Sequence, residues 1–452
     1  MLQSVLPLKK EKREAAAQRR PAPSERIRLM DLKKILLVSL GHLSCDINGG
    51  ALPALLLYLA AAHNFDYQTC GTLAFAYSAM SSVIQPVFGL VADKFSRSWF
   101  IPLGILLAGF GLGSAGFFDS FSAIFVALMI CGVGGAVFHP EGARYANLVS
   151  GAHKGVGLSI FSVGGNSGFV LGPLVVLVAV GGIPLTDTLI IGGFGLPGTA
   201  AFALIALCTA SLLYWNLSRW NLAAAKPGNA ARPENLRNDW AAFGVLSGTI
   251  IARSILFLSF NTYLPLYWKN VFHQPAQVGN AMLAFFCIFG VISNLLGGMA
   301  ADRWGFRRTI RYSGFFTLPF MALFPFAQNP WLAALLLIPI AVGLYAPFSS
   351  MVVLGQRYLA KNMGFASGIT LGVAMSIGGM ATPILGWVAD NYGGLPAAMK
   401  ILAVVTLLGA LSTLFLKRDA GERNCRPLFP EREETKRATP LKGAARFTWK
   451  HG

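Results

Sequence analysis

The sequence predicts an all-α membrane protein in which twelve transmembrane helices form two parallel six-helix repeats. Its composition is the first reason: 54% of the 452 residues are hydrophobic and only 12% are charged, whereas soluble domains average about 25% charged residues. The second reason is that apolar stretches long enough to cross a bilayer, roughly 17–25 residues each, recur along the whole chain. The third is that motifs of the first half return in the second half.

The apolar stretches are expected to be helices, because a backbone in lipid must satisfy its own hydrogen bonds. Barrel strands would instead appear as short segments of alternating polarity. The twelve predicted spans cover residues 35–60, 67–92, 98–117, 120–140, 155–180, 198–217, 241–268, 276–301, 309–327, 330–356, 364–389 and 397–416.

The basic residues indicate how these spans are oriented. Of the 37 Lys and Arg residues, 34 lie in the tails and in connections that share one side of the membrane. The positive-inside rule makes that side cytoplasmic, so we expect both termini in the cytoplasm and the protein in a bacterial inner (plasma) membrane. Orientation and attraction to anionic lipid explain the net charge of +18, and no nucleic-acid partner is expected. The basic connections are 93–97, 141–154, 216–240, 302–311 and 357–361; the three other basic residues are Arg253, Lys269 and Lys400.

The same pattern divides the chain into regions. Residues 35–217 and 241–416 are the two six-helix halves, and 218–240 is the cytoplasmic linker between them. The tails, 1–34 and 417–452, lack apolar periodicity, so we expect them to be disordered. The first apolar run begins late and is too long for a signal peptide. Five of the six cysteines lie in spans, with no disulfide framework and no metal-binding spacing.

Two pairs of motifs carry the internal repeat. "GLVADKFSR" (89–97) follows the second span and "GGMAADRWGFRR" (297–308) follows the eighth. "VGGNSGFVLG" (163–172) in span five matches "IGGMATPILG" (377–386) in span eleven. Repeated halves that enclose a site near the middle of the membrane are typical of secondary transporters.

The loop motif, G-x-x-x-D-[KR]-x-x-[RK], resembles the signature of the major facilitator superfamily, and the resemblance covers roughly residues 33–416. Within that family, the strings "GHLSCDINGG", "QPVFGLVADK" and "VFHPEGAR", in this order, resemble the fosmidomycin-resistance family of bacterial exporters. The resemblance implies class and mechanism more than cargo, because related transporters share a fold and differ in substrate.

The loop motif is expected to act as an inner gate. Its glycine lets two helices approach closely, and its aspartate can accept hydrogen bonds from a neighbouring helix N-terminus. The alternative is a static turn with solvated charges. The predicted gate residues are Asp93, Lys94, Arg97, Asp302, Arg303 and Arg307, with Gly89 and Gly298 for helix packing. A third, weaker echo of the motif ends at Asp390 on the outer side and predicts an outer clasp.

Charged residues at the end of span four are assigned to the same gate. His139 lies about 27 Å along that span, which places it near the cytoplasmic boundary, and Pro140 is expected to bend the helix there. Glu141 and Arg144 share a helix face. We expect His139, Glu141 and Arg144 to form an inner cluster; direct substrate contact is the alternative, and His139 is also able to carry protons near neutral pH.

Asp46 in span one is the predicted proton-coupling residue. It lies twelve residues after Lys34, about 18 Å along the helix, where an ionised carboxylate costs at least a few kcal/mol. His42 lies one turn earlier on the same face. The alternative is that Asp46 caps a break in the helix near Asn48 and Pro53.

Arg253 in span seven is the predicted substrate-binding cation. It lies roughly 20 Å along its span, and a buried Arg needs an anionic partner. Spans one and seven are repeat equivalents, so we expect Asp46 and Arg253 to face each other across a cavity, either exchanging partners with an anionic substrate or forming a fixed ion pair. Further polar candidates for the substrate site are Gln85, Asn166, Asn261, Tyr263, Asn294 and Tyr345.

Span five carries glycines at every fourth residue, which permits close helix contact. Part of this stretch, "GFVLGP", resembles the antiporter motif of drug–proton exchangers, although Val176 and Leu177 replace the paired glycines expected there. The residues assigned to helix packing are Gly164, Gly168, Gly172 and Pro173.

Together these observations predict a proton-coupled exporter of a small polar or anionic molecule that works by alternating access as a monomer. The alternatives are an uptake symporter on the same fold and a membrane sensor or scaffold that does not transport. An enzyme is not expected, because the sequence contains no nucleophile–base set, nucleotide-binding loop or metal cluster. No cofactor is predicted. The expected partners are a small-molecule substrate, a coupling ion and the lipid bilayer.

Overall fold

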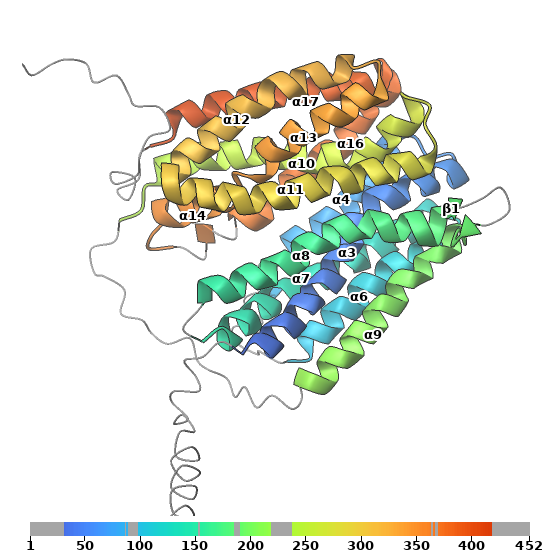
Figure 1. Cartoon of the computed structure of the whole chain (residues 1–452), viewed down its shortest axis with the longest axis horizontal. Helices are drawn as coiled ribbons and strands as arrows, with labels where there is room; N and C mark the ends of the chain where they lie inside the picture. Colours follow the sequence, from blue (N-terminus) through green and yellow to red (C-terminus); the bar gives the residue numbers. More distant parts are fainter. Residues whose placement is uncertain are drawn as a thin grey trace, which may run out of the picture.

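The computed structural model (Figure 1) describes residues 31–85, 87–88, 98–151, 154–184, 190–217, 237–362, 365–366 and 369–417. Within these residues the chain is almost entirely helical, and a helix occupies each of the twelve predicted spans. Eight helices are long and apolar enough to cross a membrane. Residues 1–30 and 418–452 of the tails and the first loop motif, with its residues Gly89, Asp93, Lys94 and Arg97, lie outside the described residues.

The first half contains six long helices and a short hairpin. The hairpin pairs Ile183 with Ile191 in antiparallel fashion. In chain order the elements are α3 (Leu32–His63), α4 (Tyr67–Val83), α6 (Phe100–Ala115), α7 (Phe121–Val149), α8 (Lys154–Val176) with a π-helical turn (Leu177–Gly181), β1 (Ile183–Pro184), β2 (Ile190–Ile191) and α9 (Ala200–Leu217) after a 3₁₀ turn (Leu196–Thr199).

The second half repeats the order of the six helices, with its fourth span divided into α13 and α14. Its elements are α10 (Trp240–Asn270), α11 (Ala276–Trp304), α12 (Phe306–Leu323) with a 3₁₀ turn (Phe324–Phe326), α13 (Pro330–Tyr345), α14 (Phe348–Tyr358), a π-helical turn (Ile369–Val373) leading into α16 (Ala374–Asn391), and α17 (Gly394–Ser412) with a 3₁₀ turn (Thr413–Phe415).

Several helices begin at a side chain that accepts a hydrogen bond from their first turn. Asp31 accepts from Lys34 N at the start of α3 and Asp66 from Thr69 N at the start of α4. Asp239 does the same for Ala242 N at the start of α10. Short carboxylate side chains are favoured there because the first backbone N–H groups of a helix lack helical partners.

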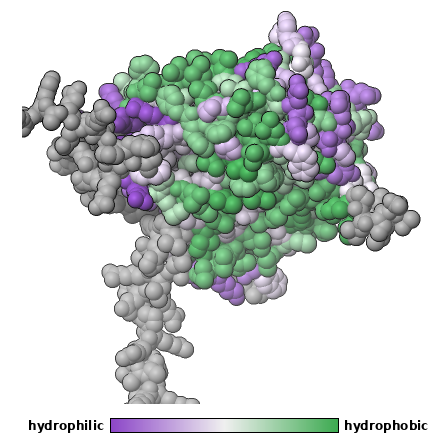
Figure 2. Space-filling model, turned by 45° about the horizontal axis from the view of Figure 1, so that its top comes forward, coloured by the Kyte–Doolittle hydropathy of each residue, from purple (hydrophilic) through white to green (hydrophobic). Residues whose placement is uncertain are grey.

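We call the end of the helix bundle that carries the start of α3 and the end of α7 the basic end, and the opposite end the far end. At the basic end, Asp31 N donates to Val149 O, and Lys417 pairs with Asp239. The far end carries β1 (Figure 1), together with the start of α4 at Tyr67. Between the two ends, Figure 2 shows a broad hydrophobic belt, which fits a surface that faces lipid.

Glycines bring α8 against α3. A Cβ atom at Gly168 would lie 2.7 Å from Ile47 N, and added Cβ atoms at Gly164 and Gly172 would collide with the backbone of Ser39 and Ala51. Such contacts between backbones need residues without side chains. The predicted packing stripe therefore faces the helix that carries Asp46.

The sequence predicted that the fourth span ends at residue 140. The structure differs, because the helix does not end at Pro140. Helix α7 continues through Pro140 to Val149, so the basic end of this span lies nine residues beyond Pro140. Membrane helices tolerate proline when neighbouring groups satisfy the freed backbone carbonyl. His139 consequently lies deeper in the bundle than we expected.

Candidate functional site

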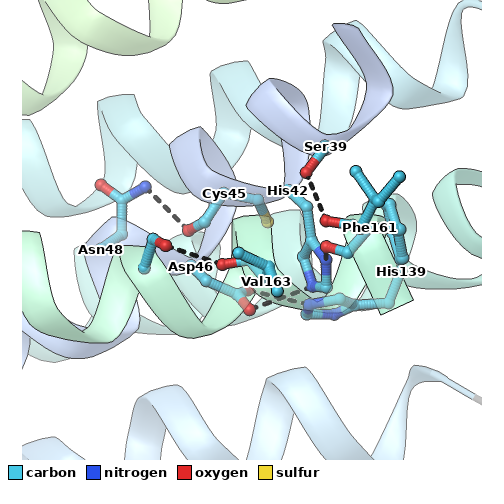
Figure 3. Close-up of polar contacts among 10 residues, drawn as sticks. Ser39, His42, Cys45, Asp46, Asn48, His139, Phe161 and Val163 are labelled. Carbon is cyan, nitrogen blue, oxygen red and sulfur yellow. Dashed lines mark hydrogen bonds and ion pairs between the residues drawn. The ribbon is translucent and has the colours of Figure 1, made fainter. Parts of the chain in front are cut away.

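Asp46 lies at the centre of a buried polar cluster formed by two helices (Figure 3). His42, one turn earlier on α3, places its Nε2 3.1 Å from Asp46 Oδ2. His139 of α7 places its Nε2 2.9 Å from Asp46 Oδ1. Asp46 is 8% exposed when the whole residue is counted. The structure therefore gives the predicted coupling carboxylate two imidazole partners, of which the sequence indicated one.

His139 joins this cluster instead of the predicted group of Glu141 and Arg144 near the boundary. The predicted span ended at residue 140, whereas α7 continues to Val149, so His139 is not at the end of its helix. Among the three side chains of the cluster, His139 is the most exposed, at 23% against 12% for His42 and 11% for Asp46.

His42 is held by α8 as well as by its own helix. Its Nδ1 lies 2.8 Å from the carbonyl oxygen of Phe161, and the two rings stack with centroids 4.0 Å apart. The ring of Phe138 lies on another side of the His42 imidazole, with the two ring centroids 5.7 Å apart. The sequence analysis overlooked both phenylalanines, since apolar side chains in an apolar span give no signal of their own.

The predicted helix break near Asp46 is absent from the described part of α3. The helix is continuous from Leu32 to His63, and the Asn48 side chain donates to the carbonyls of Ser44 and Cys45 within it. Asp46 consequently has no capping role, which leaves the two histidines as its partners.

His42, Asp46 and His139 are also the one set of described residues that could surround a metal ion, with ligand atoms within 4.8 Å of one another. Their N···O distances of 2.9 and 3.1 Å are those of hydrogen-bonded or ion-paired groups. Ligands placed about 2.0–2.1 Å from a tetrahedral zinc ion would stand farther apart. The cluster as it stands therefore has the spacing of hydrogen-bonded side chains.

Glu141 and Arg144 remain together without His139. Glu141 is fully buried, and Arg144 Nε lies 3.4 Å from its Oε2. In the second half, Asp302 and Arg303 are exposed at the end of α11 and Arg307 is partly buried on α12. Since the first loop motif lies outside the described residues, the inner gate stays a prediction.

The glycine contact in the second loop motif falls one residue earlier than predicted. A Cβ atom at Gly298 would have only Ser349 Oγ, at 3.9 Å, as a neighbour. A Cβ atom at Gly297 would collide with the backbone of Ala346. Gly297 is therefore the residue that lets α11 approach the end of α13.

Arg253 does not pair with Asp46. Its Nε donates to Leu344 O at 2.8 Å, and its guanidinium lies 4.8 Å from the ring of Phe348 and 5.5 Å from that of Phe257. The residue is 8% exposed. Among the described residues no carboxylate lies within 4.0 Å of it. The sequence indicated how far along its span each residue lies, but not the side of the helix on which it lies.

The other predicted substrate residues divide into two groups. Tyr345 packs on Phe257 with centroids 5.3 Å apart, and Cys287 Sγ lies 3.8 Å from both Tyr345 OH and Asn261 Oδ1. These residues extend the surroundings of Arg253. Tyr263 belongs to the far end instead. Gln85, Asn166 and Asn294 are partly buried.

A clasp joins the two halves at the far end. Asp390, at the end of α16, accepts hydrogen bonds from Tyr67 N at 3.0 Å and Gln68 N at 2.8 Å, the first backbone donors of α4. Tyr263 OH donates to Thr382 O at 2.5 Å, beside the same contact. The predicted outer clasp at Asp390 thus bridges the halves, where a carboxylate meets the positive end of a helix dipole.

Replacing Asp390 by Ala should loosen this clasp. A charge at a helix N-terminus contributes up to about 2 kcal/mol in favourable geometry, so we expect the far end to open roughly 5–30-fold more often. Cys70, fully buried beside this contact, should react faster with an impermeant maleimide applied from the far side in a variant that keeps only this cysteine. Asn391→Ala is the matched control, because its amide bonds only within α16. Equal labelling rates in both variants would contradict the clasp.

Comparisons with known proteins agree with this architecture. Residues 38–383 match the model of the Major Facilitator Superfamily. The chain is 31% identical to the fosmidomycin resistance protein of Escherichia coli over 84% of its own length and 91% of that protein. It is also 31% identical to the uncharacterized MFS-type transporter YfnC of Bacillus subtilis, over 84% and 92% of the two chains.

Solved structures show the same fold at low sequence identity. A bacterial homologue of the human lysosomal transporter Spinster superposes with a TM-score of 0.68 at 13% identity, over 84% of this chain and 96% of that one. The nucleoside transporter NupG superposes with a TM-score of 0.62 at 15% identity, over 85% and 98%. The chain therefore belongs to the Major Facilitator Superfamily of membrane transporters.

Proposed function

We propose that this protein is a proton-coupled exporter of a small polar, anionic molecule, and that Asp46 with its two histidines is the proton site. The observation that carries the proposal is the buried Asp46 carboxylate held between His42 and His139. An ionisable group this deep in a span is costly unless it has partners or water. Histidine changes charge near neutral pH, so the cluster is suited to binding and releasing protons under cellular conditions.

The closed far end supports alternating access. The Asp390 clasp joins α16 to α4, and Gln277 of α11 donates to Gly181 O after α8. His139 is the most exposed member of the Asp46 cluster. By the positive-inside rule the basic end is cytoplasmic, so in this proposal both termini lie in the cytoplasm and the closed far end corresponds to an inward-facing state.

Arg253 supports an anionic cargo. It is a buried cation whose described partners are a carbonyl and two aromatic rings, which leaves its charge uncompensated by any described carboxylate. A buried charge of this kind requires an anion or water. The relative in Escherichia coli is named for resistance to fosmidomycin, which favours export over uptake and provides a first compound to test here.

The proposal includes a functional monomer in the bacterial inner membrane. The second candidate function is uptake by symport, which the same cluster would also serve. The two differ in the direction of the proton gradient that drives accumulation, and this difference decides between them.

Purified protein in liposomes separates the two functions. An exchanger should accumulate radiolabelled fosmidomycin in vesicles with an acidic lumen, because protons leaving the lumen drive the compound in. A symporter should accumulate it in vesicles with an alkaline lumen. A panel of small carboxylates, phosphates and phosphonates extends the test beyond one compound. If neither gradient concentrates any member of the panel, proton-coupled transport of small anions is ruled out.

A further inference from the structure

The hydrogen-bond partners of His42 fix where its protons sit. Its Nδ1 lies 2.8 Å from the carbonyl oxygen of Phe161. A carbonyl oxygen only accepts hydrogen bonds, so Nδ1 must carry a hydrogen and donate it. When His42 is neutral, its second nitrogen, Nε2, therefore carries a lone pair.

That lone pair would face a carboxylate. Nε2 of His42 lies 3.1 Å from Asp46 Oδ2, and two unprotonated atoms at this distance repel each other. One added proton removes the repulsion, either on Nε2, which gives an imidazolium beside a carboxylate, or on Oδ2, which gives a neutral imidazole beside a carboxylic acid. Both forms contain the same number of protons.

His139 needs no additional proton for its contact. A neutral imidazole with its hydrogen on Nε2 can donate to Asp46 Oδ1, 2.9 Å away. Its Nδ1 lies beside Gly135, one turn earlier on α7, but forms no hydrogen bond of normal geometry with that residue's carbonyl, so no full contact forces a hydrogen onto this atom as well. The complete set of contacts thus requires one proton more than the fully deprotonated cluster holds.

Gly165 of α8 lies directly over the His42–Asp46 contact. A Cβ atom at this position would lie 2.5 Å from His42 Nε2 and 2.7 Å from Asp46 Oδ2. Any side chain here would push the two groups apart or displace α8, which also carries the Phe161 carbonyl. Gly165 belongs to the repeated string "VGGNSGFVLG" (163–172).

We infer that His42 and Asp46 take up and release a single proton as one unit, and that Phe161 and Gly165 of α8 are the positioning residues that hold them in this register. Loss of the proton leaves a lone pair against a carboxylate, so the contact must then open. The inference deepens the proposed proton coupling and rests on it for its role in transport, but its test needs neither transport nor substrate.

The surroundings of the pair contain few other groups that could take this proton. His139 and Cys131 face it from α7, Tyr77 from α4 and Cys45 from α3 itself. Helix α8 contributes a carbonyl and an aromatic ring at this point. Among the described groups that face the pair, His139 is therefore the other imidazole, and its spectrum is followed beside that of His42.

The experiment reads the histidine ring nitrogens directly. The full chain, labelled with ¹⁵N-histidine and placed in lipid nanodiscs, is followed by NMR from about pH 5 to 9. Spectra of His42→Gln and His139→Gln assign two of the six histidines. We expect neutral His42 to carry its hydrogen on Nδ1 at high pH, with one proton entering the His42–Asp46 pair as the pH falls. A neutral His42 protonated on Nε2, or separate uptake of a proton by each histidine, would overturn the inference.

Gly165→Ala tests the positioning role. Its His42 spectrum should change to the mixture of tautomers of a free imidazole, whereas Gly248→Ala, where an added Cβ meets nothing within 4 Å, should leave it as in the wild type. An unchanged His42 spectrum in Gly165→Ala would remove Gly165 from the account. If that variant fails to insert, the wild-type spectrum alone still decides the proton positions. The NMR result and the transport result are independent. If His42 keeps its hydrogen on Nδ1 and shares one proton with Asp46, but transport is not driven by protons, the proposed function is wrong and this inference still holds.

Discussion

Asp46→Asn is expected to abolish the accumulation of cargo driven by a pH gradient while leaving downhill exchange of cargo across the membrane. Asparagine has nearly the same shape as aspartate and can still accept a hydrogen bond from His139, but it cannot take up a proton. The ratio of cargo inside to outside should fall to about one, since no coupling free energy remains. The measurement is uptake of labelled fosmidomycin, or of whichever probe the wild type transports, into liposomes.

The matched control for this variant is Asp31→Asn. It makes the same substitution on the same helix, at an exposed residue that caps α3 and pairs with Lys34, and asparagine is also a good cap. Accumulation by this control should equal that of the wild type. If Asp46→Asn concentrates cargo as well as the control does, the coupling proton binds elsewhere.

Arg253→Ala should weaken the binding of anionic cargo by at least about 30-fold, which corresponds to about 2 kcal/mol for a lost charge-assisted hydrogen bond. Neutral analogues should bind nearly as before, because the Phe257 and Phe348 rings remain. Arg253→Lys should restore part of the affinity, as lysine keeps the charge and loses the planar fork. The measurement is equilibrium binding of a charged and a neutral probe to purified protein.

Lys400→Ala is the control for charge removal, because Lys400 is exposed at the start of α17 and rests on the ring of Phe326. It should leave both affinities unchanged. An equal loss of affinity for charged and neutral probes in Arg253→Ala would show that the arginine supports the structure and does not recognise an anion.

The fold could be predicted from the sequence because each of its determinants is local. A span needs only a run of apolar residues, and the halves follow from two repeated motifs. The helix starts at Asp31, Asp66 and Asp239 are single residues that any reader can find. The π-helical turn Leu177–Gly181 after Pro173 gave no comparable signal.

The site could be predicted only in part because it depends on which face of each helix meets its neighbours. The sequence placed Asp46 and His42 one turn apart, and the structure keeps them together. It could not show that α3 turns this face toward α7 and α8, away from Arg253. The error over His139 came from reading Pro140 as a helix end, although the chain continues as helix to Val149.

The central claim is that cargo and protons move through one coupled cycle in which Asp46 carries the proton. Liposomes loaded with fosmidomycin, or with the best probe of the panel, and a pH-sensitive dye test it directly. As cargo leaves wild-type vesicles down its own gradient, an exchanger should bring protons in and acidify the lumen, and vesicles with Asp46→Asn should release cargo with no change in luminal pH. Acidification of equal extent with Asp46→Asn, or its absence with a wild type that releases cargo, would contradict the account.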